Sequence, residues 1–178
     1  MNLPDLNRLL KYKHPDVLKM YKRNCPENAL SAEQAFTELL KYLWISKKHQ
    51  SETQNTDCRV GFGFCRTDGM VVPIENFFPK PMKEIDDMWH EFILFTQDYA
   101  DFCNHYFGEF IHHKPVIPDD NAPPRELLEL EIEPLLSYIY DNLGEETLST
   151  WYSSFIEENS ADTEEEENQQ LAVAGRSK

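Results

Sequence analysis

The sequence lacks the features that would place the protein in a membrane or send it through a secretory pathway. No stretch of its 178 residues approaches the roughly 20 consecutive apolar residues that a membrane-spanning helix needs. The N-terminal residues contain no apolar run followed by a small-residue cleavage site, as a secretory signal would. We therefore expect a soluble, cytoplasmic protein.

Several well-known catalytic signatures are absent as well. The chain has no phosphate-binding loop, nucleophile elbow, dinucleotide fingerprint or H-E-x-x-H zinc helix. Its four cysteines form no C-x-x-C pair, which excludes a zinc ribbon and a thioredoxin-like site, and the expected compartment favours reduced thiols. These absences lower the expectation of an enzyme without excluding one.

Basic residues are scarce outside the N-terminal region. The chain has 32 acidic and 17 basic residues, a net charge of -15. Residues 1–50 contain nine basic and five acidic side chains, whereas the remaining 128 residues contain eight and 27. A surface this negative repels phosphate backbones and anionic lipids, so we expect a protein partner rather than nucleic acid or membrane.

Apolar residues at helical spacing predict a mainly α-helical fold. The clearest helix begins at Ser31, which with Gln34 forms a capping box. A buried stripe then follows at spacings of three and four residues. This stripe consists of Phe36, Leu39, Leu40, Leu43 and Trp44. The longest periodic segment, from Lys83 to about Tyr106, predicts a long central helix.

Two other segments complete the predicted domain organisation. Alternating apolar residues before the turn signal at 66–69, and the apolar run Met70-Val71-Val72 after it, predict one small β-hairpin near 58–74, inserted before the central helix. Helical spacing resumes over roughly 125–156, divided by Pro134 and with Gly144 as a C-cap. We expect a single helical domain over residues 1–156, followed by an acidic, disordered tail at 157–178.

Residues that can bind metal gather in the segment 85–113. Five of them are candidate ligands: Asp86, His90, Cys103, His112 and His113. Asp86 and His90 lie four residues apart on one helical face, and a helix end at Gly108 would let either of the last two histidines return to them. On a straight helix Cys103 lies away from His90. These ligand types suit Zn²⁺ or Fe²⁺, whereas the alternative is a carboxylate hydrogen-bonded to a surface histidine.

The same segment resembles the core motif of the glycine-rich domain-containing protein-like family, which is largely uncharacterised. The matching positions are Pro81, Ile85, Asp86, Trp89, His90, Tyr99, Cys103, Gly108 and His112. This sequence departs from that motif at Phe92, where a second histidine is usual, and at His113, where an aspartate is frequent. The family commonly has proline at the position of Thr96, and a kink there would bring Cys103 towards His90.

These observations leave three hypotheses for function. The first is a binding or regulatory module that acts through protein contacts, with a structural metal or a polar cluster of histidine, aspartate and cysteine. The alternative is a mononuclear metal-dependent enzyme that uses Asp86, His90 and either His112 or His113. The third, a nucleophilic Cys103 activated by a histidine, requires an exposed thiol, whereas the helical projection places this thiol at the edge of the core.

Overall fold

The computed structural model describes residues 3–53, 63–65, 71–73, 80–113 and 134–152. Within these ranges the protein is mainly helical, as predicted. No helix in this part of the chain is both long and apolar enough to cross a bilayer. The predicted tail at 157–178 lies outside the described residues, so its boundary and its disorder remain predictions.

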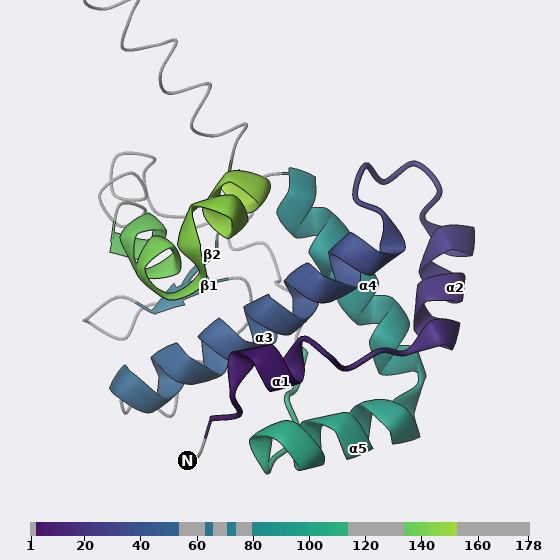
Figure 1. The fold of residues 1–178 in the computed structure, drawn as a ribbon, viewed down its shortest axis with the longest axis horizontal. Helices are drawn as coiled ribbons and strands as arrows, with labels where there is room; N and C mark the ends of the chain where they lie inside the picture. Colours follow the sequence, from purple (N-terminus) through teal and green to yellow (C-terminus); the bar gives the residue numbers. More distant parts are fainter. Residues whose placement is uncertain (1–2, 54–62, 66–70, 74–79, 114–133, 153–178) are drawn as a thin grey trace, which may run out of the picture.

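Two short helices open the chain and pack on the third. Helix α1 spans Leu6–Leu9, and helix α2 spans Pro15–Asn24. The side chain of His14 caps α2, because its Nδ1 accepts a hydrogen bond from the backbone N–H of Val17 at 3.3 Å. Figure 1 shows α1 lying across the middle of α3, with α2 at one end of the bundle.

Helix α3 spans Ala32–Thr53 and forms the centre of the fold. The predicted capping box is present: the Ser31 backbone N–H donates to Gln34 Oε1 at 3.1 Å, and the Gln34 N–H donates to Ser31 Oγ at 3.2 Å. Near the end of the helix at Thr53, Lys48 and Glu52 pair one turn apart.

Two short strands lie between α3 and the next helix. Strand β1 spans Gly63–Cys65 and strand β2 spans Val71–Pro73, and they pair antiparallel with Phe64 opposite Val72. The rest of the predicted hairpin region lies outside the described residues, so its extent remains a prediction.

The predicted long central helix is wrong, because the structure divides it in two. Helix α4 spans Lys80–Leu94, helix α5 spans Thr96–Phe107, and Phe95 between them has φ -84° and ψ 64°. The break brings Phe92 and Tyr99 together, with ring centroids 5.1 Å apart. In a straight helix seven residues rise about 10 Å, so these rings would not meet. Figure 1 shows α5 leaving α4 in a new direction beneath α1.

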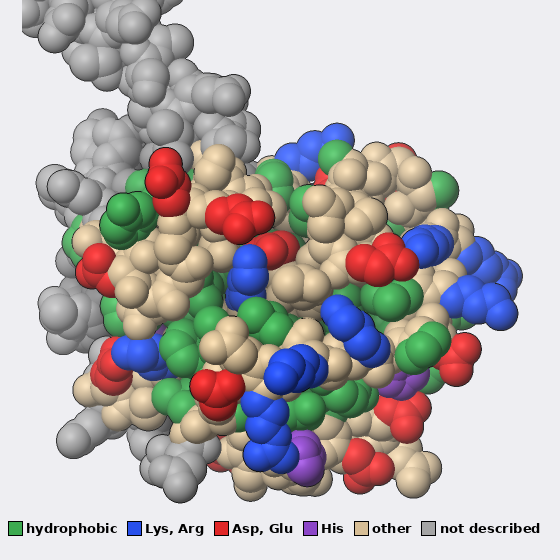
Figure 2. All heavy atoms as spheres, in the orientation of Figure 1, with side chains coloured by type: hydrophobic (Ala, Val, Ile, Leu, Met, Phe, Trp, Pro, Cys, Tyr) green, Lys and Arg blue, Asp and Glu red, His purple; other side chains and the backbone are tan. Residues whose placement is uncertain are grey.

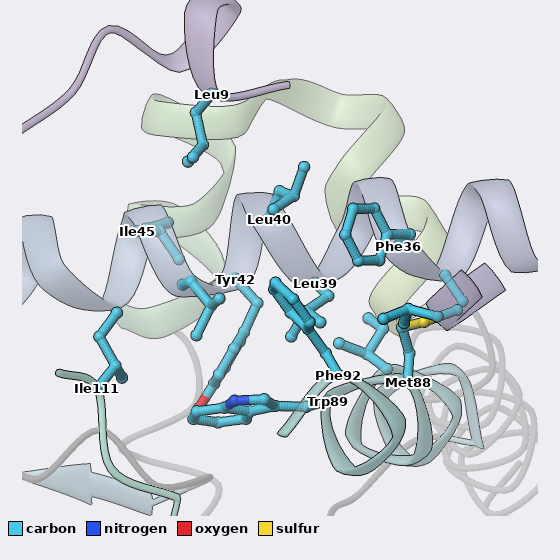
Figure 3. Close-up of a cluster of buried hydrophobic side chains, with 14 of the residues drawn as sticks. Leu9, Phe36, Leu39, Leu40, Tyr42, Ile45, Met88, Trp89, Phe92 and Ile111 are labelled. Carbon is cyan, nitrogen blue, oxygen red and sulfur yellow. The ribbon is translucent and has the colours of Figure 1, made fainter. Parts of the chain in front are cut away.

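The core lies where α3 and α4 cross. Aromatic and aliphatic side chains of the two helices interdigitate there, as Figure 3 shows. Four residues of the predicted α3 stripe are buried at 1% exposure or less, and they are Phe36, Leu39, Leu40 and Leu43. Their partners on α4 include Met88, Trp89 and Phe92, which are equally buried. This packing fixes the rotation of α4, and therefore the direction in which its polar face points.

Residues 134–152 are helical and close one side of the core. Ile139 and Trp151 are buried there. Trp151 Nε1 donates to Glu38 Oε2 on α3 at 2.9 Å. Gly144 has a φ of 81°, in the left-handed region that favours glycine, and Figure 1 shows the ribbon changing direction within this segment. The part of the predicted helical region before residue 134 lies outside the described residues.

Figure 2 shows Lys and Arg side chains together with Asp and Glu side chains on one face of the molecule. Two lysines of the N-terminal third pair with acids of the same region. Lys22 Nζ lies 2.8 Å from Glu33 Oε1, and Lys41 Nζ lies 2.8 Å from Glu38 Oε1. These lysines therefore neutralise neighbouring acids of their own chain.

Candidate metal site

The polar face of α4 presents Asp86 and His90 one turn apart. His90 Nδ1 lies 2.9 Å from the Asp86 carbonyl oxygen and 3.3 Å from Asp86 Oδ2. A carbonyl oxygen only accepts, so Nδ1 is the nitrogen that holds the proton and Nε2 has the lone pair. The helical spacing alone places this pair together, as the sequence predicted.

His113 joins them from the far end of α5. Its Nε2 lies 2.7 Å from Asp86 Oδ1, and the His90 and His113 ring centroids are 4.5 Å apart. The ligand atoms of all three residues lie within 4.8 Å of one another. In the described part of the chain this is the one group of at least three His, Cys, Asp or Glu side chains close enough to share an ion.

The chain reaches this position through a turn at Gly108. Gly108 caps α5 with a φ of 74°, and its N–H donates to the Asn104 carbonyl at 3.1 Å. A side chain added at Gly108 would meet no atom within 4 Å, so the position requires glycine for its backbone conformation and not for lack of space. Residues 109–113, which we call the histidine arm, then run back along α4.

Contacts beyond the candidate ligands hold the histidine arm in place. Lys47 Nζ on α3 lies 2.5 Å from Glu109 Oε1 near the start of the arm. Two residues later, the Ile111 carbonyl accepts a hydrogen bond from the Tyr99 hydroxyl at 2.7 Å. The Tyr99 oxygen in turn accepts a hydrogen bond from Trp89 Nε1 at 2.9 Å. The arm is therefore fixed at two points before it reaches His113.

The three candidate ligands differ in their exposure to water. The His113 side chain is 11% exposed and packs edge-on against the Trp89 indole, with ring centroids 4.4 Å apart. Asp86 is 25% exposed, and His90 is 57% exposed. The cluster therefore has an apolar wall on the Trp89 side and is open to solvent on the His90 side.

The other two candidate ligands are placed elsewhere. Cys103 is fully buried, and its thiol contacts Tyr99 and the Ile111 backbone rather than Asp86 or His90. Burial raises the pKa of the Cys103 thiol, which disfavours the thiolate needed for a metal ligand or a nucleophile. His112 is exposed, with its ring 4.8 Å from that of Phe110. The break at Phe95 thus redirects the chain without bringing Cys103 to His90.

Sequence reasoning missed two residues that shape the site. Lys47 lies in the last turns of α3, and its ammonium is buried beside Glu109. The Tyr99 ring is in the core, and its hydroxyl joins α4 to the histidine arm. Neither contact has a local signal, because each depends on the break at Phe95 and the turn at Gly108.

Similarity to known proteins is confined to the region of the site. Residues 70–120 match the family described as UCP032817-like, which is uncharacterised. The match covers less than a third of the chain, from β2 through the histidine arm. No curated protein and no solved structure matches the chain.

The predicted resemblance to the glycine-rich domain-containing protein-like family is wrong, since the match is to a different family and nothing indicates the first. The physical reason lies in the positions that suggested it. Ile85, Trp89, Tyr99 and Cys103 are buried, and Gly108 ends a helix. A pattern of core and turn positions is required by the packing of two helices, so it does not distinguish one helical family from another.

Proposed function

We propose that this protein binds one divalent transition-metal ion, such as Zn²⁺ or Fe²⁺, through Asp86, His90 and His113. The observation that supports the proposal is the convergence of two imidazoles on one carboxylate. His113 Nε2 lies 2.7 Å from Asp86 Oδ1, and one potential ligand atom of each of the three residues lies within 4.8 Å of those of the other two. Ligands of a tetrahedral Zn²⁺ ion stand about 3.4 Å apart, given metal–ligand distances of about 2.1 Å. His90 would bind the ion through the nitrogen with the lone pair, so its ring must turn Nε2 towards the other two ligand atoms.

The donor set also limits which ions fit. Two imidazoles and a carboxylate suit Zn²⁺ and Fe²⁺, whereas Ca²⁺ and Mg²⁺ prefer sites made of oxygen ligands. The buried Cys103 thiol contributes no sulfur ligand in this arrangement. The proposal therefore predicts a site of nitrogen and oxygen donors that prefers transition metals to alkaline earths.

In this proposal the ion is open to solvent and has a functional role. The fold does not depend on it. Structural zinc sites are closed by four protein ligands, while catalytic sites use three and leave a position for water or substrate. Here three side chains converge and the His90 side faces solvent. The histidine arm is already held by Lys47 and Tyr99, so the fold does not need an ion to order it.

An ion held in this way would polarise a bound oxygen atom or lower the pKa of a bound water. Three converging side chains with one side open to solvent favour the metal-dependent enzyme over the module that acts through protein contacts. The reaction, the substrate and any protein partner remain open in both.

The adjacent residues His112 and His113 provide a matched pair of variants for testing this proposal. Purified wild type, His113→Ala and His112→Ala are each loaded with Zn²⁺, passed through a desalting column and examined by elemental analysis. We expect about one zinc per chain in the wild type and in His112→Ala, because the His112 side chain lies outside the cluster. His113→Ala should lose most of its zinc, because only one imidazole and the carboxylate remain.

Circular dichroism with and without chelator accompanies the measurement. A functional ion leaves the helical signal of the chelated wild type unchanged, whereas unfolding on chelation would show a structural ion. Equal zinc contents in His112→Ala and His113→Ala, or no zinc in the wild type, would overturn the proposal.

A further inference from the structure

We infer that Tyr99 is a positioning residue of the metal site, which sets the affinity for the ion without touching it. This inference rests on the proposed function. Tyr99 is fully buried, and besides its contact with the Cys103 thiol its hydroxyl donates to the Ile111 carbonyl at 2.7 Å and accepts from Trp89 Nε1 at 2.9 Å. One oxygen atom thus joins the helix that provides two ligands to the arm that provides the third.

On the α4 side, the hydrogen bond from Trp89 Nε1 to the Tyr99 hydroxyl fixes the orientation of the Trp89 indole. Trp89 directly precedes His90, and its ring packs edge-on against His113. The hydrogen bond to Tyr99 allows one indole orientation in which Nε1 is satisfied inside the core. The same orientation forms the apolar wall behind the His113 imidazole.

On the arm side, the contact fixes the backbone two residues before His113. Ile111 is 6% exposed, with its side chain in the core near Tyr42 and Trp89, as Figure 3 shows. The hydroxyl bond to its carbonyl orients this peptide, so only the backbone of two further residues and the His113 side chain set the imidazole position. Without the hydroxyl, the Ile111 carbonyl would be a buried acceptor without this partner, and the arm could relieve that cost by moving.

The remaining anchor of the arm cannot take over this role. Glu109 is 44% exposed and lies four residues before His113, so its contact with Lys47 fixes the start of the arm but not its end. The Cys103 thiol also contacts Ile111, but a thiol is a weak hydrogen-bonding group. Tyr99 therefore makes the described hydrogen bond to the arm that lies nearest to His113 in the sequence and does not come from a candidate ligand.

The test compares Tyr99→Phe with Tyr21→Phe. Both substitutions remove the hydroxyl of a buried tyrosine and keep its ring, and Tyr21 accepts one hydrogen bond from Asn28 on the α2 side of the fold. Zn²⁺ affinity is measured by competition with a chromophoric chelator, and the visible absorption of Co²⁺-loaded protein reports the ligand geometry. Supporting contacts behind metal ligands typically change affinity by 10–100-fold.

We expect Tyr99→Phe to bind Zn²⁺ about 10–100-fold more weakly and to show an altered Co²⁺ spectrum. Tyr21→Phe should lose a similar amount of thermal stability and bind both ions as the wild type does. Identical affinity and spectra in the two variants would overturn the inference, because a purely structural tyrosine would affect stability alone.

A measurement on the metal-free protein separates this inference from the proposed function. ¹⁵N NMR of the imidazoles in a chelator-treated sample detects the hydrogen bond between His113 Nε2 and Asp86. We expect it in the wild type and in Tyr21→Phe and expect it weakened in Tyr99→Phe. If the wild type binds no metal, the proposed function fails, and this signal still decides the role of Tyr99: an unchanged signal in Tyr99→Phe contradicts it.

Discussion

Two of the carboxylates on helix α4, Glu84 and Asp86, differ in what surrounds them. Glu84 is 2% exposed, and its two oxygens accept hydrogen bonds from the backbone N–H groups of Ala29 and Leu30 at 2.9 and 2.7 Å. Asp86, two residues later, is partly exposed, and its oxygens face the imidazoles of His90 and His113. Both carboxylates have partners, but the partners differ in kind.

The difference indicates which acid stabilises the fold and which is available for chemistry. Backbone amides are fixed in place and donate only, so Glu84 fastens the chain between α2 and α3 to α4. Imidazole nitrogens can exchange a proton for a metal ion, so Asp86 and its partners can change state without unfolding the protein. One helix thus supplies a structural carboxylate, Glu84, and the carboxylate of the proposed metal site, Asp86.

The largest expected effect comes from exchanging the two carboxylates for amides in turn. Glu84→Gln should lower the free energy of unfolding by about 2–4 kcal/mol, because a buried charge-assisted hydrogen bond is lost and one backbone N–H then faces an amide group. Asp86→Asn should cost less than about 1 kcal/mol, because its pairs with histidine are partly exposed. Urea denaturation of both variants measures the difference.

Zinc binding should follow the opposite order. Folded Glu84→Gln should bind Zn²⁺ with wild-type affinity, and Asp86→Asn should bind it at least 10-fold more weakly. If Asp86→Asn destabilised the protein as much as Glu84→Gln and still bound zinc, the distinction between the two acids would be wrong.

A smaller effect concerns the thiol behind the site. Burial raises the pKa of Cys103 above that of an unfolded cysteine, so between the two values the unfolded state loses its proton while the folded state keeps it. The stabilisation is fully present below the unfolded pKa and is lost as pH rises through the folded pKa. Stability should therefore decline above about pH 8.5, with a slope of at most about 1.4 kcal/mol per pH unit from this group.

Cys103→Ala should make the decline of the free energy of unfolding with pH less steep. This holds however much the substitution destabilises the protein at neutral pH. Urea denaturation at pH 7.5, 8.5 and 9.5 measures the slope, with Cys25→Ala as a control for the less buried cysteine, whose thiol pKa is also raised by burial and by nearby acids. An unchanged slope in Cys103→Ala would show that the thiol ionises as easily in the folded state, and its exclusion as a ligand would lose its basis.

The sequence was informative where a local pattern decides the structure. The capping box of Ser31 and Gln34 formed as predicted, and the spacing of Asp86 and His90 placed both on one helical face. These features depend on residues three or four apart, where helical geometry alone determines proximity. The spacing of Asp86 and His90 thus predicted two of the three residues of the candidate metal site.

The spacing of apolar residues does not predict the break at Phe95, and only the family resemblance suggested a kink, at Thr96. Apolar periodicity continues through it, and neither glycine nor proline marks it. The bend is instead favoured by distant packing: the Tyr12 ring contacts both Phe92 and Phe102 at tilted angles, with ring centroids 6.1 and 4.8 Å away. Tertiary contacts of this kind override local periodicity, and they also decided that His113 rather than its neighbour joins Asp86.

X-ray absorption spectroscopy of the zinc-loaded wild type identifies the atoms that bind the ion. We predict a coordination shell of nitrogen and oxygen atoms at about 2.0–2.1 Å, with the outer-shell scattering of two imidazoles and no sulfur. A zinc–sulfur distance of about 2.3 Å would place a cysteine among the ligands. That result, or a shell with no imidazole, would contradict a site built from Asp86, His90 and His113.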